Sequence, residues 1–168
     1  ADITVVADVV VQKYGDHKPL YRQQQAFDRI GIPLTRQTLC DWVGWCSDQL
    51  EPVVRAMADH IRLQPLIQSD ETPVRMQLRN GQMQTARLWA YGLPWSEVVF
   101  DFRTDRSQHG PAEFLAGAQA QHIQADGGSL YTPVLSRLSM SHIACMAHIR
   151  RKIYEAREDA PAPSKQLL

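Results

Sequence analysis

Residues 65–93, PLIQSDETPVRMQLRNGQMQTARLWAYGL, determine the class of fold that we expect for this chain. The stretch contains two strand-like runs that flank Asn80-Gly81. Asn-Gly is the strongest short-range sequence signal for a tight β-hairpin. The stretch therefore predicts two antiparallel strands joined by a hairpin turn.

One residue in this stretch is unusual for a strand. In LIQSDETPV, residues 66–74, an apolar lead-in is followed by Asp70, and apolar sequence then resumes. An ionised carboxylate in or beside a core costs several kcal/mol unless it is paired or holds a metal ion. We therefore expect Asp70 to have a functional partner; a role as a turn or helix cap is the alternative.

The sequence after the hairpin alternates between strand-like and helix-like segments. A third strand-like run, residues 97–103, follows a Pro-Trp-Ser turn and completes an antiparallel meander. We then expect a helix at 111–120, a strand at 122–126, a short helix at 132–138, a strand at 141–148 and a basic amphipathic helix at 148–159. Three antiparallel strands followed by alternating helices and strands are the topology of the ribonuclease-H-like fold, an α/β fold with a mixed sheet.

The sequence before the hairpin is expected to be mainly helical. Residues 3–13 are apolar all round, which fits a buried helix or a strand. A helix is expected from Pro19 to its end at Gly31. Thr35 then has the position of an N-cap, and apolar residues recur every three or four positions as far as residue 62. At Pro52 we expect a kink or a break, with a second helix starting near residue 51.

Length and composition limit the organisation of the protein. The chain has 168 residues, 44% of them hydrophobic, which suits one globular domain with a small annex. We expect a helical annex at 1–64, the α/β core at 65–160 and a Pro-rich tail at 161–168. The sequence lacks an initiator Met and starts within an apolar pattern, so we expect it to be part of a longer protein.

Charge and cysteine content indicate the surroundings of the protein. The 18 basic and 18 acidic residues balance, so the net charge does not indicate a nucleic-acid partner. Arg dominates the basic residues and suits phosphate contacts, although an Arg-rich composition from a GC-rich genome explains it equally well. The 3 cysteines are scattered, and no apolar run approaches a membrane span. We expect a cytoplasmic protein without membrane contact.

Asp126 is the partner that we expect for Asp70. It lies at the C-terminal end of the strand expected at 122–126. If the two strands are neighbours, both carboxylates emerge close together, and a divalent cation such as Mg²⁺ offsets their repulsion. A pair of such ions can activate a nucleophile and stabilise the leaving oxygen of a phosphoryl transfer. A turn or cap role is the alternative for Asp126 too.

Six blocks of the chain form a recognisable series. They are KYGDHKPLYRQQQAFDRIGIPLTRQTLCDWV (13–43), QSDETPVRM (68–76), LWAYGL (88–93), VVFDFRTDRS (98–107), IQADGG (123–128) and ACMAHIRRKIYEA (144–156). In order and spacing these blocks resemble the central part of the insertion-sequence-sixty-six (IS66) family of bacterial transposases. The resemblance covers nearly the whole chain.

The resemblance implies a DDE transposase, a metal-dependent enzyme with a ribonuclease-H-like core that cuts element ends and joins them to target DNA. Asp70 matches the first acidic residue of the family and Asp126 the second. Two Mg²⁺ or Mn²⁺ ions are expected in the complete active site. Double-stranded DNA is the expected partner, and a homo-oligomer is the expected state of the full protein.

The third acidic residue of the family has no match in this chain. The family has a glutamate in a later helix, beside an Asn-Asn run, and no such run exists here. Glu155 and Glu158 lie where simpler relatives keep this glutamate, but also in the basic block that precedes the inserted segment of the family. We expect the third residue beyond Leu168 and expect the present chain alone to be inactive.

Two groups of basic residues are candidate DNA contacts. Arg150, Arg151 and Lys152 form a cluster on the last expected helix, and Arg106 follows the third strand. Both groups would touch phosphates without reading sequence. A solvated helix face is the alternative for the cluster.

The segment 19–45 has the layout of a helix-turn-helix. That layout would place Arg36 and Gln37 at the start of a recognition helix, whereas packing against the core or a partner subunit is the alternative.

His142, Cys145 and His148 are residue types that bind zinc. On a strand, however, Cys145 would point away from both histidines, and a fourth ligand is missing, so zinc is not expected. The 4 Trp are expected to be packing residues.

Strand cleavage and transfer by a transposase is thus the function that we expect. Two alternatives compete with it. One is another two-metal nuclease of the same fold, and the other is a non-catalytic DNA-binding or assembly module.

Overall fold

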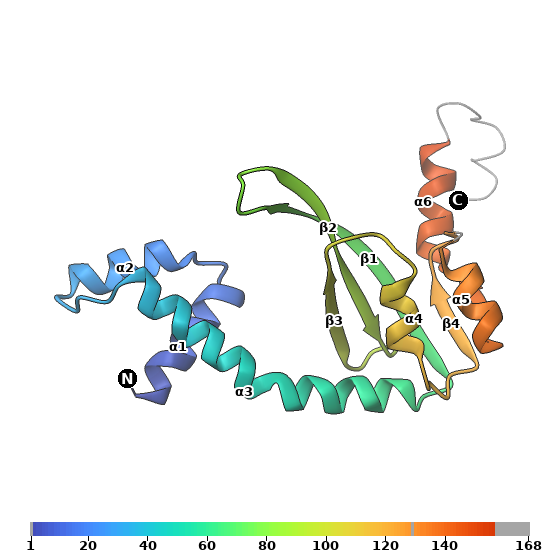
Figure 1. Cartoon of the computed structure of the whole chain (residues 1–168), viewed down its shortest axis with the longest axis horizontal. Coiled ribbons are helices and arrows are strands. Elements are labelled where there is room, and N and C mark those ends of the chain that lie inside the picture. The colour runs from blue at the N-terminus through green and yellow to red at the C-terminus, as the bar shows by residue number, and fades with distance from the viewer. Residues whose placement is uncertain (1, 129, 157–168) are drawn as a thin grey trace. The chain divides into compact units, whose positions relative to one another are not determined.

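The computed structural model describes residues 2–128 and 130–156 of the chain (Figure 1). It divides into two compact units, Ala1–Arg55 and Ala56–Leu168. The elements follow in the order α1 (Ile3–Tyr14), α2 (Leu20–Arg29), α3 (Arg36–Arg62), β1 (Leu66–Gln77), β2 (Met83–Gly92), β3 (Val98–Arg103), α4 (His109–Leu115), β4 (His122–Ala125), α5 (Tyr131–Leu138), β5 (Ser141–Ala144) and α6 (Met146–Glu155).

The first unit is helical. Residues 3–13, whose pattern fits either a helix or a strand, belong to helix α1. The side chain of Asp2 caps this helix by accepting the N–H of Thr4 at 2.8 Å. Helix α2 is tied to it by a polar residue, since the buried amide of Gln23 donates to the carbonyl oxygens of Val9 at 3.2 Å and Lys18 at 3.1 Å. This arrangement satisfies buried carbonyl groups, as a folded interior requires.

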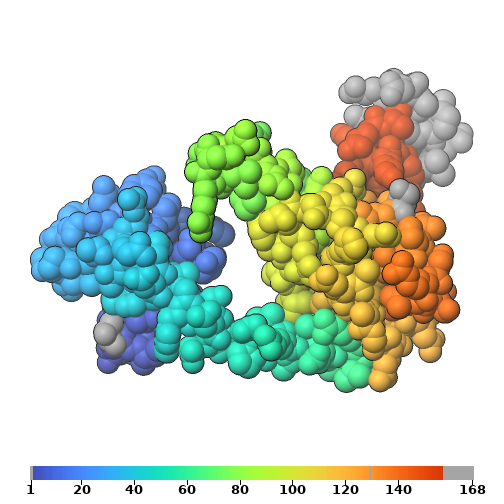
Figure 2. All heavy atoms as spheres, viewed as in Figure 1, coloured from blue at the N-terminus to red at the C-terminus, as the bar shows by residue number. Residues whose placement is uncertain are grey.

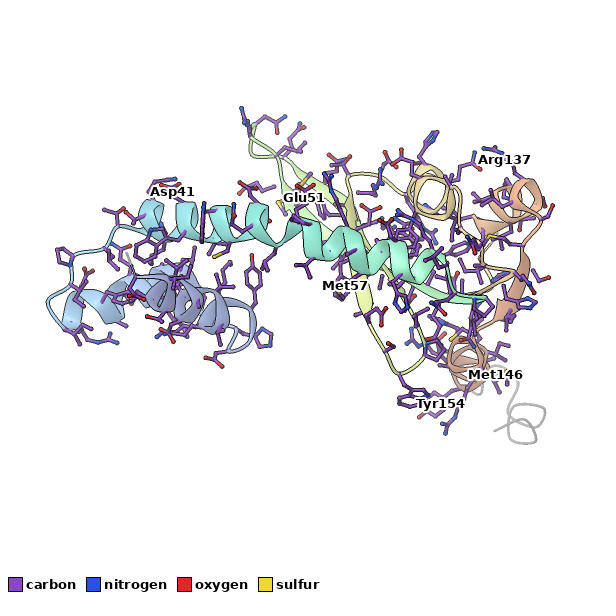
Figure 3. The ribbon with its side chains drawn as sticks, turned by 90° about the horizontal axis from the view of Figure 1, so that it is seen from below. Asp41, Glu51, Met57, Arg137, Met146 and Tyr154 are labelled. Carbon is purple, nitrogen blue, oxygen red and sulfur yellow. The ribbon has the colours of Figure 1, made fainter. Side chains whose placement is uncertain are left out.

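Helix α3 begins where the sequence predicts and continues farther. The hydroxyl of Thr35 accepts the N–H of Thr38 at 3.1 Å, which is the predicted N-cap interaction. The helix then runs for 27 residues through Pro52 (Figure 3). The second helix predicted to start near residue 51 is therefore wrong. A proline removes one backbone hydrogen bond of a helix, and here the turns on either side continue without it.

The second unit contains a mixed sheet of five strands in the order β3-β2-β1-β4-β5. Strand β2 pairs antiparallel with both β1 and β3, while β4 pairs parallel with both β1 and β5. The hairpin predicted at Asn80-Gly81 joins β1 to β2, and Gly81 has the positive φ, +82°, that such a turn requires. The chain is therefore a mixed α/β protein in which a helical region precedes the sheet.

One face of the sheet carries the core. Helices α4 and α5 lie on this face (Figure 1), and their apolar side chains pack with those of the central strands. The ring of Tyr91 stacks on Phe114 with centroids 3.7 Å apart, and Trp89 meets Tyr131 edge-on at 6.0 Å. Trp89 thus has the predicted packing role, whereas Trp95 is wholly exposed in the β2–β3 turn, which corrects the prediction for that residue.

The opposite face of the sheet is much more exposed. On β3 the alternate residues Val98, Phe100 and Phe102 are 43%, 60% and 48% exposed. The strand register places Phe100 beside Ala90, which in turn pairs with Asp70. Asp70 therefore belongs to this second face.

The last strand and helix differ from their predicted bounds. Strand β5 ends at residue 144 and α6 begins at residue 146, so the strand predicted at 141–148 is too long. The apolar run at 143–147 continues past the strand end, which is why the pattern misplaces the boundary. Helix α6 has no buried residue and projects beyond the sheet (Figure 2). The part of the predicted helix after residue 156, the candidate Glu158 and the predicted tail at 161–168 lie outside the described residues.

Among the described residues, no helix is both long and apolar enough to span a membrane.

Candidate functional site

Asp70 stands on the exposed face of β1, two residues beyond the stretch in which β1 pairs with β4. Its neighbours Ser69 and Glu71 turn their side chains toward the face covered by α4 and α5, since successive residues of a strand alternate. The carboxylate of Asp70 is 59% exposed and accepts the N–H of Glu71 at 2.9 Å through Oδ1. A charge in the middle of this strand therefore avoids the cost of burial.

Asp126 lies one strand away, at the same end of the sheet. The last residues paired between β1 and β4 are Gln68 and Gln124, and each aspartate follows its own partner of this pair by two residues. The predicted site requires the strands that carry Asp70 and Asp126 to be neighbours, and β1 and β4 are neighbouring parallel strands. Oδ1 of Asp126 accepts the N–H of Gly128 at 3.2 Å, so Asp126 also makes the turn contact that was its alternative role.

A third carboxylate near this end was not predicted. Glu71 is 12% exposed and forms an ion pair with Arg106, while its Oε2 is buried without a hydrogen bond to any described residue. The signal that points to Glu71 is its place directly after Asp70, because alternation sends it to the opposite, buried face. Sequence alone does not show that Arg106 meets it there.

The hydroxyl of Tyr131 contacts the strand that carries Asp70 and Glu71. It shares a hydrogen bond of 2.8 Å with Ser69 inside the core. Burial raises the pKa of Tyr131 above its usual range, and the negative charges of Asp126, Glu71 and Asp70 raise it further. The phenol therefore stays neutral.

Arg106 is placed differently from its predicted use. Its guanidinium is already paired with Glu71, and this hydrogen bond is the largest cause of the raised pKa of Arg106. Asp126 is near enough to contribute to the same shift. Arg106 thus lies beside Glu71, and its contact with DNA stays a prediction.

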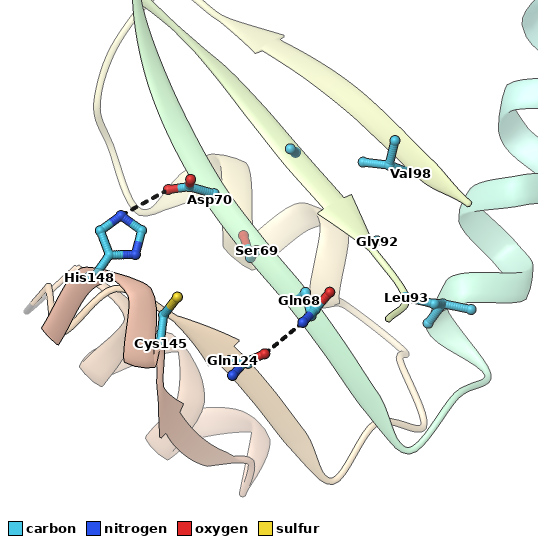
Figure 4. Close-up of a pocket in the computed structure, with 10 residues that line it drawn as sticks. Gln68, Ser69, Asp70, Gly92, Leu93, Val98, Gln124, Cys145 and His148 are labelled. Atoms are coloured by element: carbon cyan, nitrogen blue, oxygen red, sulfur yellow. Dashed lines mark hydrogen bonds and ion pairs between the residues drawn. The ribbon is translucent and has the colours of Figure 1, made fainter. Parts of the chain in front are cut away.

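Helix α6 starts directly beside the two aspartates. The backbone N–H of Cys145 donates to the carbonyl of Ala125 at 2.9 Å, which fixes the start of the helix to the residue before Asp126. From the first turn, Nε2 of His148 approaches Oδ1 of Asp70 to 3.8 Å (Figure 4). His148 was predicted on a strand, pointing away from Cys145, and that geometry is wrong because both face β1 from the start of α6.

A cavity of about 220 Å³ separates α6 from the sheet beside Asp70 (Figure 4). Its polar wall includes Gln68, whose amide donates to that of Gln124 at 2.7 Å. The other lining residues are Ser69, Asp70, Ala90, Gly92, Leu93, Val98, Cys145 and His148. The cavity therefore joins the candidate catalytic carboxylate to the exposed face of the sheet.

The predicted basic cluster is exposed but divided. Arg150 and Arg151 line a separate surface hollow of about 380 Å³ together with Ala147 and Tyr154. Lys152 instead reaches the loop after Asp126, since a Cβ built on Gly127 would lie 4.0 Å from its Nζ. The cluster does not act as one surface.

The helix-turn-helix layout of α2 and α3 places its two candidate DNA contacts at the start of α3. Arg36 and Gln37 are both exposed there. The amide of Gln37 donates to Asp41 at 2.8 Å. Neither residue is engaged in a core, and DNA reading by this helix stays a prediction.

The donor atoms present suit a hard divalent cation better than zinc. In the part of the chain that the structure describes, no three His, Cys, Asp or Glu side chains are grouped to hold a metal ion. Mg²⁺ needs fewer protein ligands, because it keeps water and substrate phosphate in its shell and uses one or two carboxylates. Oδ2 of Asp70 and Oδ2 of Asp126 make no hydrogen bond with any described residue, so both are available as ligands.

Comparisons with known proteins agree with these observations. The model of the family described as Transposase IS66 family matches residues 1–167. Uncharacterized protein y4jD of Sinorhizobium fredii (strain NBRC 101917 / NGR234) is 31% identical over 170 residues, which cover 92% of this chain and 33% of that protein. Uncharacterized protein y4hP of the same strain is 28% identical over 163 residues, covering 90% of this chain and 29% of that protein. The chain thus spans about a third of the length of these relatives.

Proposed function

Because the chain belongs to the IS66 family of transposases, we propose that it contributes the carboxylate end of a DDE active site, which cuts and joins DNA in a metal-dependent reaction. The proposal concerns the whole protein, because the curated relatives that the chain matches are about three times as long as the matched stretch. The present chain supplies the sheet and two of the acidic residues.

The strand order supports a ribonuclease-H-like core. A meander of three antiparallel strands is followed by two parallel strands on the far side of β1, in the order β3-β2-β1-β4-β5. β1 and β4 pair in parallel only over 66–68 and 122–124, so the residues that follow this paired stretch in each strand run on in the same direction. This is the topology that the sequence pattern indicates.

The observation that carries the proposal is the matched position of Asp70 and Asp126. Each follows the last β1–β4 pair by two residues, and each has one carboxylate oxygen without a partner among the described residues. We propose that these two oxygens bind Mg²⁺ or Mn²⁺, which when bound would stabilise the charge that develops on a reacting phosphate. The protein orients them through two backbone N–H groups, those of Glu71 and Gly128.

No described residue takes the place of the third acidic residue. Glu155 is the last residue of α6, seven positions after His148, which is about 10 Å farther along the helix axis at 1.5 Å per residue. This distance does not favour Glu155 as a ligand shared with Asp70. We propose that the third acidic residue is outside the described part of the protein.

The DNA would cross this end of the sheet. Arg150, Arg151 and Lys152 are exposed on α6, Lys152 toward the loop after Asp126 and the two arginines on another face, and exposed cations attract the phosphate backbone. The net charge of the chain is zero, so this local cluster rather than the whole surface would provide the attraction.

Metal binding by calorimetry tests the proposal. We expect Asp70→Asn and Asp126→Asn each to weaken Mn²⁺ binding by about tenfold or more, because each removes one charged ligand. Asp28→Asn is the matched control, since this carboxylate on α2 is exposed and its side chain makes no hydrogen bond or ion pair with a described residue. Equal Mn²⁺ affinity in all three variants would refute the paired-carboxylate site.

A non-catalytic DNA-binding module is the second candidate, favoured by the lack of a third grouped ligand among the described residues. The two candidates differ in one assay. The longer family protein, given duplex DNA that carries its element ends and Mg²⁺, should cut the duplex if the chain forms part of an active site. Binding without cutting would favour the module.

A further inference from the structure

We propose that His148 and Lys152, on one face of α6, hold a phosphate group of DNA over the end of the sheet that carries Asp70 and Asp126. This inference rests on the proposed function, because it assigns the reacting phosphate to particular side chains. It separates these two residues from Arg150 and Arg151, with which the sequence grouped Lys152.

The two groups occupy different faces of the helix. Residues four apart in a helix lie on the same face because a turn has 3.6 residues. His148 and Lys152 are four apart and therefore share one face of α6. Arg150 and Arg151 line the separate hollow with Ala147 and Tyr154. One face of α6 is thus turned to the two aspartates and the other is turned to solvent.

His148 is held firmly but has unused hydrogen-bonding capacity. Its side chain is only 24% exposed, and its Nδ1 is buried without a hydrogen bond to any described residue. The distance from Nε2 to Oδ1 of Asp70, 3.8 Å, exceeds the limit of about 3.2 Å for a hydrogen bond. An acceptor that enters the cavity beside Asp70 therefore meets the imidazole of His148, whose Nε2 makes no short hydrogen bond with a described residue.

Lys152 also has unused hydrogen-bonding capacity, and it lies near the second aspartate, Asp126. Its Nζ lies next to Gly127, the residue after Asp126, and it forms no ion pair within the described residues. Arg106, the other cation close to these carboxylates, is already paired with Glu71. Lys152 thus makes no ion pair with a described residue, and His148 makes only its long contact of 3.8 Å with Asp70, so these two are better able than Arg106 to take up a new anion.

A phosphate is the anion that fits this arrangement. Two carboxylates repel a phosphate, so a phosphate at this edge needs donors opposite to them. His148 and Lys152 stand on α6, across the cavity and the 126–128 loop from the two carboxylates. A cavity of about 220 Å³ leaves room for a phosphate and its waters between helix and sheet.

The test compares binding of a short fluorescent DNA duplex with and without Ca²⁺, by fluorescence anisotropy. In His148→Ala and Lys152→Met we expect the gain in affinity that Ca²⁺ produces to fall by about tenfold. In Arg150→Met and Arg151→Met we expect weaker binding without Ca²⁺, a lower salt dependence, and an unchanged gain. Lys152→Arg keeps the charge and should restore most of the gain. The same loss of gain in all four substitutions to Ala or Met would overturn the proposal.

A second measurement does not depend on the variants. In the chain labelled with ¹⁵N at histidine, the imidazole signal of His148 should shift when the duplex is added, while that of His17, in the first unit, should not. A stationary His148 signal, while the duplex demonstrably binds, would contradict the inference. Unchanged metal affinity in the two aspartate variants contradicts the proposed function instead, so the two failures are distinguishable.

Discussion

The Asp126 carboxylate can occupy its position because Gly128, two residues later, has no side chain. A Cβ built on Gly128 would lie 2.9 Å from Oδ1 of Asp126, closer than real Cβ contacts allow. Gly128→Ala should therefore displace the carboxylate and weaken Mn²⁺ binding by about tenfold. Gly127→Ala is the matched control, because its Cβ would meet only the flexible end of Lys152 at 4.0 Å. If both variants bind Mn²⁺ like the unaltered chain, the turn does not position Asp126.

A buried hydroxyl pair supports the strand that carries Asp70. Tyr131 and Ser69 share a hydrogen bond of 2.8 Å in the core. Tyr131→Phe leaves the Ser69 hydroxyl without a partner, so we expect a loss of about 1–3 kcal/mol in the free energy of unfolding. Ser69→Ala added to Tyr131→Phe should cost little more, since no unpaired group is then left. Urea unfolding of both single variants and the double variant measures the coupling, and strict additivity would mean that the hydroxyls do not interact.

At the scale of elements, one carboxylate links the β2–β3 turn to the end of α3. Glu97 accepts hydrogen bonds from Ser96 and His60, and these lower its pKa to about 2, the bond from Ser96 contributing most. A carboxyl with a lowered pKa stabilises the fold above its unfolded value of about 4.5, and this contribution is lost as the pH falls toward 2.

Glu97→Gln should therefore lower the melting temperature most near pH 5, and the difference from the unaltered chain should shrink as the pH approaches 2. Thermal unfolding at a series of pH values between these limits checks the prediction. A difference that stays constant over this range would show that the charge of Glu97 is not involved.

Elements were predictable from the sequence where the signal was local. Asn80-Gly81 fixes the hairpin, and Thr35 fixes the start of α3, because each acts through its own neighbours. The boundary between β5 and α6 was not predictable in this way. The hydrogen bond from Cys145 to Ala125 at the strand end joins residues 20 positions apart, and the apolar run at 143–147 continues past it.

At the scale of the whole molecule, the two faces of the sheet differ in what they contribute. Phe114 is 6% exposed and stacks on Tyr91, whereas Phe100 is 60% exposed on the other face. Phe114→Ala should cost about 3–5 kcal/mol in the free energy of unfolding, and Phe100→Ala less than about 1 kcal/mol. Chemical denaturation of the two variants compares the faces directly. Similar losses for both would mean that the second face is also part of a packed core.

The candidate site could be predicted only in part because it depends on pairing between distant strands. The sequence identified Asp70 and Asp126 and required β1 and β4 to be neighbours, and the structure places these strands side by side. It did not indicate that Glu71 pairs with Arg106 or that His148 faces Asp70. These contacts arise from the register of the sheet and the start of α6, which no local pattern of residues contains.

The central claim is that Asp70 and Asp126 bind one metal centre. Paramagnetic broadening by Mn²⁺ in NMR spectra of the ¹⁵N-labelled chain tests it most directly, because broadening falls steeply with distance from the ion. The account predicts that the amide signals of residues 70–72 and 126–128 broaden together at the lowest Mn²⁺ concentrations, and that neither set does so in Asp70→Asn. Broadening of only one of the two segments, or of exposed carboxylates throughout the chain to the same extent, would contradict it.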